Sequence, residues 1–131
     1  MSINEWSDAT AMAEAVRNKT VSPSRTCKDI SEAERTNTKI NAIVSQRYEK
    51  ALEEAETRDF SDKPFAGVPI FLKDLGQEQA GEPSTAGSRL FTSYRAKETD
   101  NYVKKLEELG FIIIGRSSTP EFGFKNISDA Q

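Results

Sequence analysis

The hydrophobic pattern of the chain predicts helices in its first part. Apolar residues recur three and four positions apart in two segments, at Ala9, Met12, Ala13 and Val16 and again at Tyr48, Ala51, Leu52 and Ala55. This spacing is typical of a helix with one buried face. Ser7 is the expected N-cap of the first helix, and Ser22-Pro23 predicts the start of a second helix that ends near Asn37. The alternation from Ile40 to Ser45 predicts a short strand, so helices dominate the segment 7–58.

The second half contains two continuous apolar runs, 68–72 and 111–114. Continuous runs, unlike alternating ones, indicate strands that are covered on both faces, as in parallel sheets. Between them the pattern predicts a helix with Thr99 as its N-cap and Gly110 as its C-terminal stop. Strand, helix and strand in this order predict a right-handed βαβ unit within 66–123.

One further segment follows each strand of this unit. The connection 75–98 is longer than a crossover requires, and such long loops are often functional. After the second strand, Thr119-Pro120-Glu121 predicts the cap and first turn of a short helix.

The expected architecture is α/β and incomplete. Two strongly apolar parallel strands require neighbouring strands and helices, because small parallel ribbons do not normally stand alone. We therefore expect residues 1–131 to be the N-terminal segment of one larger domain with a mixed sheet. Unpaired strand edges would make self-association of such a segment possible.

Composition excludes several classes of function. The chain has 131 residues, a formal net charge of −3 and no histidine. The charge does not suggest a nucleic-acid partner, and the lack of histidine excludes Ser-His-Asp and Cys-His catalysis and most zinc sites within this chain. The single Cys27 has no partner for a disulfide and is expected to be a small core residue. Without a signal peptide or a membrane-spanning segment, the chain is expected to be cytoplasmic.

The candidate catalytic residue is Lys73, which closes the first apolar run in the sequence Gly67-Val-Pro-Ile-Phe-Leu-Lys-Asp. The carboxyl edge of an open α/β sheet is where such folds bind ligands. A desolvated lysine has a lowered pKa and can act as a general base, although a lysine at a strand end is more often a solvated terminus. Other motifs are weak: Gly115-Arg116-Ser117-Ser118-Thr119 lacks the final glycine of a nucleophile elbow, and no phosphate-binding loop is present. No cofactor or metal is expected.

Several motifs together resemble the amidase signature family. They are Ser22-Pro23, Ile40-Asn-Ala-Ile-Val44, Phe65-Ala-Gly-Val-Pro-Ile-Phe-Leu-Lys-Asp74, Ser84-Thr-Ala-Gly-Ser88, Leu109-Gly-Phe-Ile-Ile-Ile-Gly-Arg116 and Thr119-Pro-Glu-Phe-Gly123. The resemblance implies amide hydrolysis or transfer by a serine nucleophile, a second serine in a cis peptide, and a lysine that matches Lys73. The substrate would be a small amide.

The resemblance also implies what this chain lacks. Both family serines would lie beyond Gln131, and none of Ser84, Ser88, Ser117 or Ser118 matches them, so the chain alone is expected to be inactive. The motifs are more similar to free-standing amidases, including 6-aminohexanoate-cyclic-dimer hydrolases, than to transamidosome subunits. Two alternatives remain open: a subunit of a glutamyl-tRNA amidotransferase, and a non-catalytic binding module with the amidase N-terminal fold.

Overall fold

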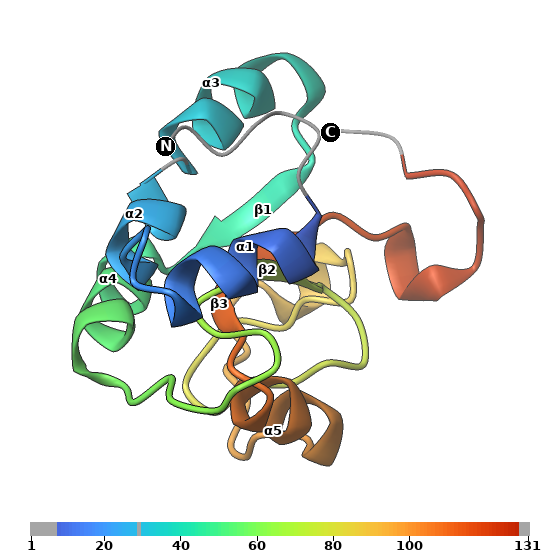
Figure 1. The fold of residues 1–131 in the computed structure, drawn as a ribbon. Coiled ribbons are helices and arrows are strands. Elements are labelled where there is room, and N and C mark those ends of the chain that lie inside the picture. Colours follow the sequence, from blue (N-terminus) through green and yellow to red (C-terminus); the bar gives the residue numbers. More distant parts are fainter. Residues whose placement is uncertain (1–7, 29, 129–131) are drawn as a thin grey trace.

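A small mixed sheet lies between two layers of helices in the computed structural model, which describes residues 8–28 and 30–128 (Figure 1). The elements in chain order are α1 (Ala9–Arg17), α2 (Pro23–Lys28), α3 (Ile30–Ile40), β1 (Ile43–Gln46), α4 (Tyr48–Thr57), β2 (Pro69–Lys73), the 3-10 turn η1 (Arg89–Phe91), α5 (Asn101–Glu108), β3 (Ile112–Ser117) and the 3-10 turn η2 (Glu121–Gly123). Helices α1 and α4 pack on one face of the sheet, and α5 packs on the other.

The sheet has the strand order β1-β3-β2. Strands β2 and β3 are parallel, with Pro69 opposite Ile112 and Lys73 opposite Ser117. Strand β1 runs antiparallel to β3. The predicted βαβ unit, formed by β2, α5 and β3, is therefore confirmed, and so is the α/β class with a mixed sheet.

The central position of β3 explains its continuous apolar run. Ile112 and Ile114 join the cluster that includes Val16 of α1 and Ala51 of α4, whereas Ile113 joins Val103 of α5 on the opposite face. Successive side chains of a strand point to opposite faces, so a strand covered on both faces needs apolar residues at every position.

Strand β2 differs from the expectation of burial on both faces. Leu72 is buried, but Pro69, Ile70 and Phe71 are only half-buried. Within the described residues, β2 pairs with β3 alone and lies at an edge of the sheet. A strand at an edge has a neighbouring strand on one side only, so Pro69, Ile70 and Phe71 are less covered than the residues of β3.

The structure moves several predicted helix boundaries. Asp8 is the N-cap of α1, where its carboxylate accepts a hydrogen bond from Ala11 N at 2.9 Å, and Ser7 lies outside the described residues. The predicted second helix comprises α2 and α3, and α3 continues to Ile40 instead of ending near Asn37. The Asn37 side chain bonds both the N–H and the carbonyl of Ile43, which begins β1. The side chain of Cys27 lies outside the described part of the chain.

The N-cap of α5 is Asp100 and not the predicted Thr99, and Asp100 makes no side-chain capping bond. Instead, Thr99 Oγ1 accepts from Ala80 N at 3.0 Å and Asp100 Oδ2 accepts from Glu78 N at 2.8 Å. Both side chains therefore satisfy the backbone of the 75–98 connection. That connection is not without structure, because it contains η1 and an isolated bridge between Pro83 and Arg95.

Gly110 follows α5 as predicted, with a φ of +103° and no room for a Cβ, which would lie 2.7 Å from Lys63 Cβ. The predicted short helix after β3 is a single 3-10 turn, η2, with Pro120 in the N-cap position.

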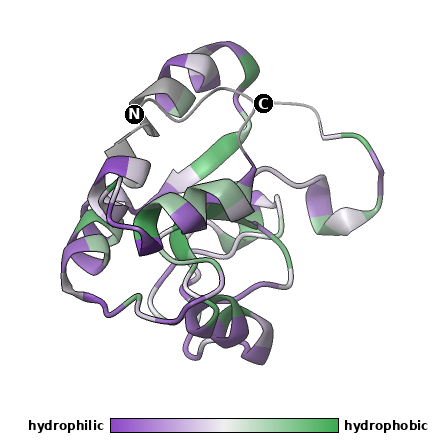
Figure 2. Cartoon of the chain, in the orientation of Figure 1, coloured by the Kyte–Doolittle hydropathy of each residue, from purple (hydrophilic) through white to green (hydrophobic). Residues whose placement is uncertain are grey.

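Hydrophilic residues cover much of α4 and α5 (Figure 2). None of the helices in the part of the chain that the structure describes is long and apolar enough to cross a membrane.

Candidate active site

Lys73 is the last residue of β2 and lies at the carboxyl edge of the parallel pair, where the sequence placed it. Its Nζ donates a hydrogen bond of 2.6 Å to the carbonyl oxygen of Ser118, the residue that follows β3. The bond orients the amine along the ends of both strands. The side chain is exposed among the described residues, so these residues do not by themselves desolvate the amine.

Both the N–H and the carbonyl of the Lys73 backbone form hydrogen bonds with side chains. Lys73 N donates to Gln77 Oε1 at 2.7 Å, and Arg116 Nη1 donates to Lys73 O at 2.9 Å. Arg116 is 2% exposed, and its burial lowers the pKa of the guanidinium, although the charges of Asp74 and other carboxylates oppose this shift. Neither Gln77 nor Arg116 was assigned a role from the sequence, because their contacts depend on the path of the loop.

Asp74 is 2% exposed and ties the 75–98 connection to the end of β2. Its carboxylate accepts from Thr85 N at 2.8 Å and also from the Thr85 hydroxyl. Buried carboxylates need such bonds, because an unpaired buried charge is costly. The result is that the segment around Thr85 returns to within a few residues of Lys73.

The same connection also contacts the segment after β3. Phe122 N donates to Ala86 O at 2.8 Å, and the Ser88 hydroxyl donates to Glu121 Oε1 at 2.7 Å. Gly87 lies so close to Thr119 that a Cβ would be 2.5 Å from the Thr119 carbonyl oxygen. The two segments that leave the carboxyl ends of β2 and β3 therefore form one structure.

Exposed aromatic rings gather on these two segments. Phe91 makes edge-on contacts with Tyr94 and Phe122, and Phe122 contacts Phe124. Phe124 is 86% exposed. Phe122 lies in the motif Thr119–Gly123, but no role was predicted from the sequence for these four aromatic residues, although Phe122-Gly123-Phe124 repeats an aromatic residue at close spacing.

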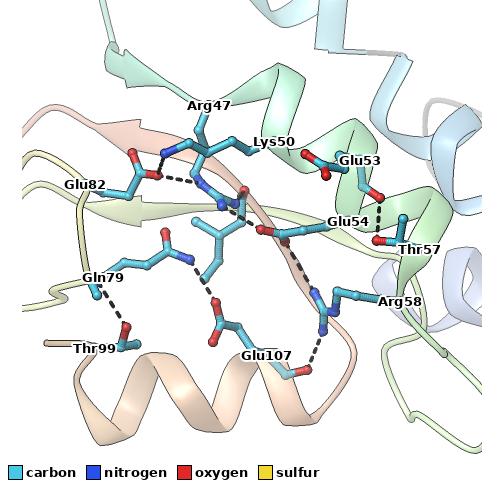
Figure 3. A network of polar contacts seen from close by, with 12 residues as sticks. Arg47, Lys50, Glu53, Glu54, Thr57, Arg58, Gln79, Glu82, Thr99 and Glu107 are labelled. Carbon is cyan, nitrogen blue, oxygen red and sulfur yellow. Dashed lines mark hydrogen bonds and ion pairs between the residues drawn. The ribbon is translucent and has the colours of Figure 1, made fainter.

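A charged network supports the connection from the side of α4 (Figure 3). Arg47 bonds Glu54 at 2.6 Å and Glu82 at 3.3 Å, and Lys50 bonds Glu82 at 2.7 Å. Burial lowers the pKa of Arg47, but hydrogen bonds and charges from Glu54 and Glu82 outweigh it and leave the pKa raised. For Glu82, burial raises the pKa, and the bonds from Lys50 and Arg47 reverse this and leave it lowered.

The four serines compared above with the family serines do not surround the Lys73 amine with hydroxyl groups. Lys73 Nζ bonds the carbonyl of Ser118 and not its hydroxyl, while the hydroxyl of Ser117 donates to Leu72 O at 3.4 Å. Ser84 and Ser88 are buried in the 75–98 connection. In the part of the chain that is described, no three acidic, histidine or cysteine side chains form a group able to hold a metal ion.

Comparisons with known proteins place this chain in a family. The family model described as Amidase matches residues 26–128. A lipoamidase of Enterococcus faecalis is 40% identical over 130 residues, which cover 97% of this chain and 18% of that protein. A 6-aminohexanoate-cyclic-dimer hydrolase of Paenarthrobacter ureafaciens is 35% identical over 124 residues, covering 92% of this chain and 24% of that protein.

The amidotransferase class is also represented. A subunit of the glutamyl-tRNA(Gln) amidotransferase of Nitratidesulfovibrio vulgaris is 37% identical over 93 residues, or 68% of this chain and 19% of that protein. The chain therefore spans about a fifth to a quarter of the length of these curated relatives.

The fold of this chain also resembles the folds of solved amidase structures. The structure of a 6-aminohexanoate cyclic dimer hydrolase complexed with substrate superposes with a TM-score of 0.83 at 34% identity, covering 92% of this chain and 25% of that chain. Because the family model matches more than half of its residues, the chain belongs to the amidase signature family of amide-cleaving enzymes.

Proposed function

We propose that this chain is the lysine-bearing N-terminal part of an amidase, and that Lys73 is its general base and general acid. The observation that supports this proposal is the position of Lys73, at the carboxyl edge of the parallel pair, with its amine hydrogen-bonded to the residue that follows the neighbouring strand. A titratable group at such an edge lies where α/β folds perform their chemistry.

The proposed reaction is the hydrolysis of a carbon–nitrogen amide bond. A serine oxygen attacks the amide carbonyl, and its proton passes through a second serine to the neutral amine of Lys73. The lysine then returns a proton to the leaving amine, and water hydrolyses the resulting ester. Both serines would come from sequence outside these 131 residues, so the chain by itself should not hydrolyse amides.

The amine must be neutral to accept a proton, and a lysine in water is protonated at pH 7. Lys73 is exposed among the described residues. We therefore propose that the remaining part of the enzyme covers the amine, because desolvation lowers the pKa of a lysine. Coverage of this edge would also exclude water from the reaction.

Small linear or cyclic amides are the proposed substrates. One relative is named for a cyclic dimer of 6-aminohexanoate and another is named lipoamidase, and both align over more than nine-tenths of this chain. The amidotransferase relative matches a shorter part, 68% of the chain. Hydrolysis is therefore favoured over amide transfer to an acyl-tRNA.

Replacement of the lysine tests the role of Lys73. In the protein made from the complete reading frame that includes residues 1–131, Lys73→Ala should reduce kcat on small amides by about 10²–10⁴-fold, the usual contribution of a positioned acid–base group. Lys73→Arg is the matched control, because arginine keeps the charge and cannot be deprotonated. It should be as inactive as the alanine variant.

Three results would contradict the proposal. Retention of near-normal turnover by Lys73→Ala would remove the lysine from the chemistry. Turnover by the isolated 131-residue chain would mean that one of its own serines is the nucleophile. Glutamine-dependent conversion of an acylated tRNA, without hydrolysis of small amides, would instead identify the amidotransferase class.

A further inference from the structure

One buried arginine joins the backbone of Lys73 to the loop that follows it. Arg116 Nη1 donates to Lys73 O at 2.9 Å, and Arg116 Nη2 donates to Gln77 O at 2.6 Å. The two bonds come from one planar group, whose rigid fork fixes the separation of its two acceptors. Gln77 in turn uses its side chain to accept from Lys73 N at 2.7 Å.

The Arg116 side chain is buried, and the two hydrogen bonds that it donates both go to backbone carbonyls. The residue is 2% exposed, and among the described residues it forms no ion pair with a carboxylate. A buried guanidinium without hydrogen bonds would be strongly unfavourable, and bonds from a charged donor are stronger than those from a neutral one. The positions of Lys73 O and Gln77 O are therefore tightly coupled to the position of Arg116.

We propose that Arg116 is a positioning residue for Lys73. The inference rests on the proposed function, in which Lys73 performs the proton transfers. Lysine has a long, flexible side chain, so the location of its amine depends on how well both ends are fixed. The bond from Nζ to Ser118 O fixes the far end, and Arg116 with Gln77 fixes the backbone end.

The effect of losing this support should appear in turnover. A misplacement of about 1 Å in a catalytic group can cost on the order of 10²-fold in rate, even when its cause lies away from the chemistry. Arg116 does not bond the lysine amine itself in this structure, so its removal should leave the amine present but poorly placed. We therefore expect kcat to fall and KM to change little.

Arg47 offers a matched control in the same chain. Its side chain is 9% exposed, it donates to a β3 carbonyl, Ile113 O, at 2.6 Å, and it reaches the 75–98 connection through Glu82. It forms none of the bonds to the Lys73 backbone. Replacing it removes another guanidinium that bonds a backbone carbonyl, here together with ion pairs to Glu54 and Glu82, and leaves the bonds to the Lys73 backbone in place.

The test compares Arg116→Met with Arg47→Met in the protein made from the complete reading frame. Circular dichroism and thermal unfolding establish the folded fraction of each variant, and kcat and KM on one small amide are measured for the folded protein. Arg116→Met should lower kcat by about 10- to 100-fold with KM within about twofold. Arg47→Met should lower kcat less than about threefold, since the placement of the lysine is unchanged. Arg116→Lys keeps a charged donor but lacks the planar fork that spaces the two bonds, so its kcat should lie between the wild type and Arg116→Met.

Equal effects of Arg116→Met and Arg47→Met on kcat, at equal folded fractions, would overturn the positioning role. If Arg116→Met does not fold, Arg116→Lys decides, since it keeps the buried charge and removes the rigid fork; the proposal then requires a fall in kcat of at least about fivefold. Lys73→Ala is measured beside them. A fully active Lys73→Ala would refute the proposed function itself, whereas an inactive Lys73→Ala with a fully active Arg116→Met would refute only the positioning role.

Discussion

Gly87 holds the 75–98 connection against the segment after β3, and replacing it with alanine is a direct test of that junction. Gly87 has a φ of +66°, and an added Cβ would lie 2.5 Å from the carbonyl oxygen of Thr119. Gly81, in the same connection, has a φ of +80° and no atom within 4 Å of its added Cβ. The two alanine variants therefore share a backbone penalty and differ in the steric clash.

The magnitudes follow from this difference. A non-glycine residue in the left-handed region costs about 1–2 kcal/mol. Gly81→Ala should therefore lower the free energy of unfolding by about that amount. Gly87→Ala carries the same penalty and must also move the Thr119 carbonyl away, and forcing an extra methyl into a packed site typically costs about 1–3 kcal/mol. Gly87→Ala should thus be the less stable variant by about 1–3 kcal/mol.

Urea unfolding of both variants measures the difference, and comparison of midpoints at a common slope removes the extrapolation error. Hydrogen exchange adds a local measurement, because Phe122 N donates to Ala86 O at 2.8 Å beside Gly87. The amide of Phe122 should exchange faster in Gly87→Ala and remain protected in Gly81→Ala. Faster exchange there would show that the junction has opened.

Equal losses of stability in the two variants would refute this reasoning, because the backbone penalty that both share would then explain the whole loss and the steric clash would contribute nothing. Unchanged protection of Phe122 in Gly87→Ala would also contradict it, since the Thr119 segment could not have moved. A larger loss in Gly81→Ala than in Gly87→Ala would show that the junction is not where the connection is fixed.

Three further predictions concern pH, the core and the isolated chain. The pKa of Glu82 is lowered in the folded state, so the ionised carboxylate stabilises the fold. This contribution is complete above the pKa of the unfolded chain, about 4.5, and is lost as the pH falls through the lower pKa of the folded state. In Glu82→Gln, the free energy of unfolding should therefore decrease less steeply as the pH is lowered. Ile113→Ala should cost about 2–5 kcal/mol in urea unfolding, and the half-buried Ile70→Ala clearly less; equal costs would contradict the sheet packing. The isolated 131-residue chain should self-associate in concentration-dependent light scattering, because large apolar side chains such as Leu90 and Phe124 are 77% and 86% exposed; a strict monomer at all concentrations would refute this.

The parallel strand–helix–strand unit could be predicted because its signals are local. The apolar run in β3 reflects burial on both faces of the sheet, by Ile112 and Ile114 on one face and by Ile113 on the other. Gly110 follows α5 at a position where the backbone has a positive φ. The same run of residues through Lys73 places the amine at the end of β2. These features depend on periodicity and on backbone preferences that neighbouring residues determine.

Other features depended on contacts between distant segments. Thr99 and Asp100 have the chemistry of helix caps, yet both accept hydrogen bonds from the backbone of the 75–98 connection instead. Local preference for a cap is worth about 1 kcal/mol, so an unsatisfied loop N–H group nearby can decide which bond forms. The same reason explains why Asn37, predicted as a helix end, bonds Ile43 of the next strand.

The sequence by itself determined the class of the fold, the family and the location of Lys73 at a strand end. Only the tertiary structure decided what holds that lysine, because Arg116 and Gln77 meet its backbone through the folding of β3 and the loop onto β2. Apolar periodicity depends on residues that are close in sequence, but each buried backbone N–H and C=O bonds a partner that the folded chain brings within reach. That partner can be distant in sequence, so no periodic pattern predicts it.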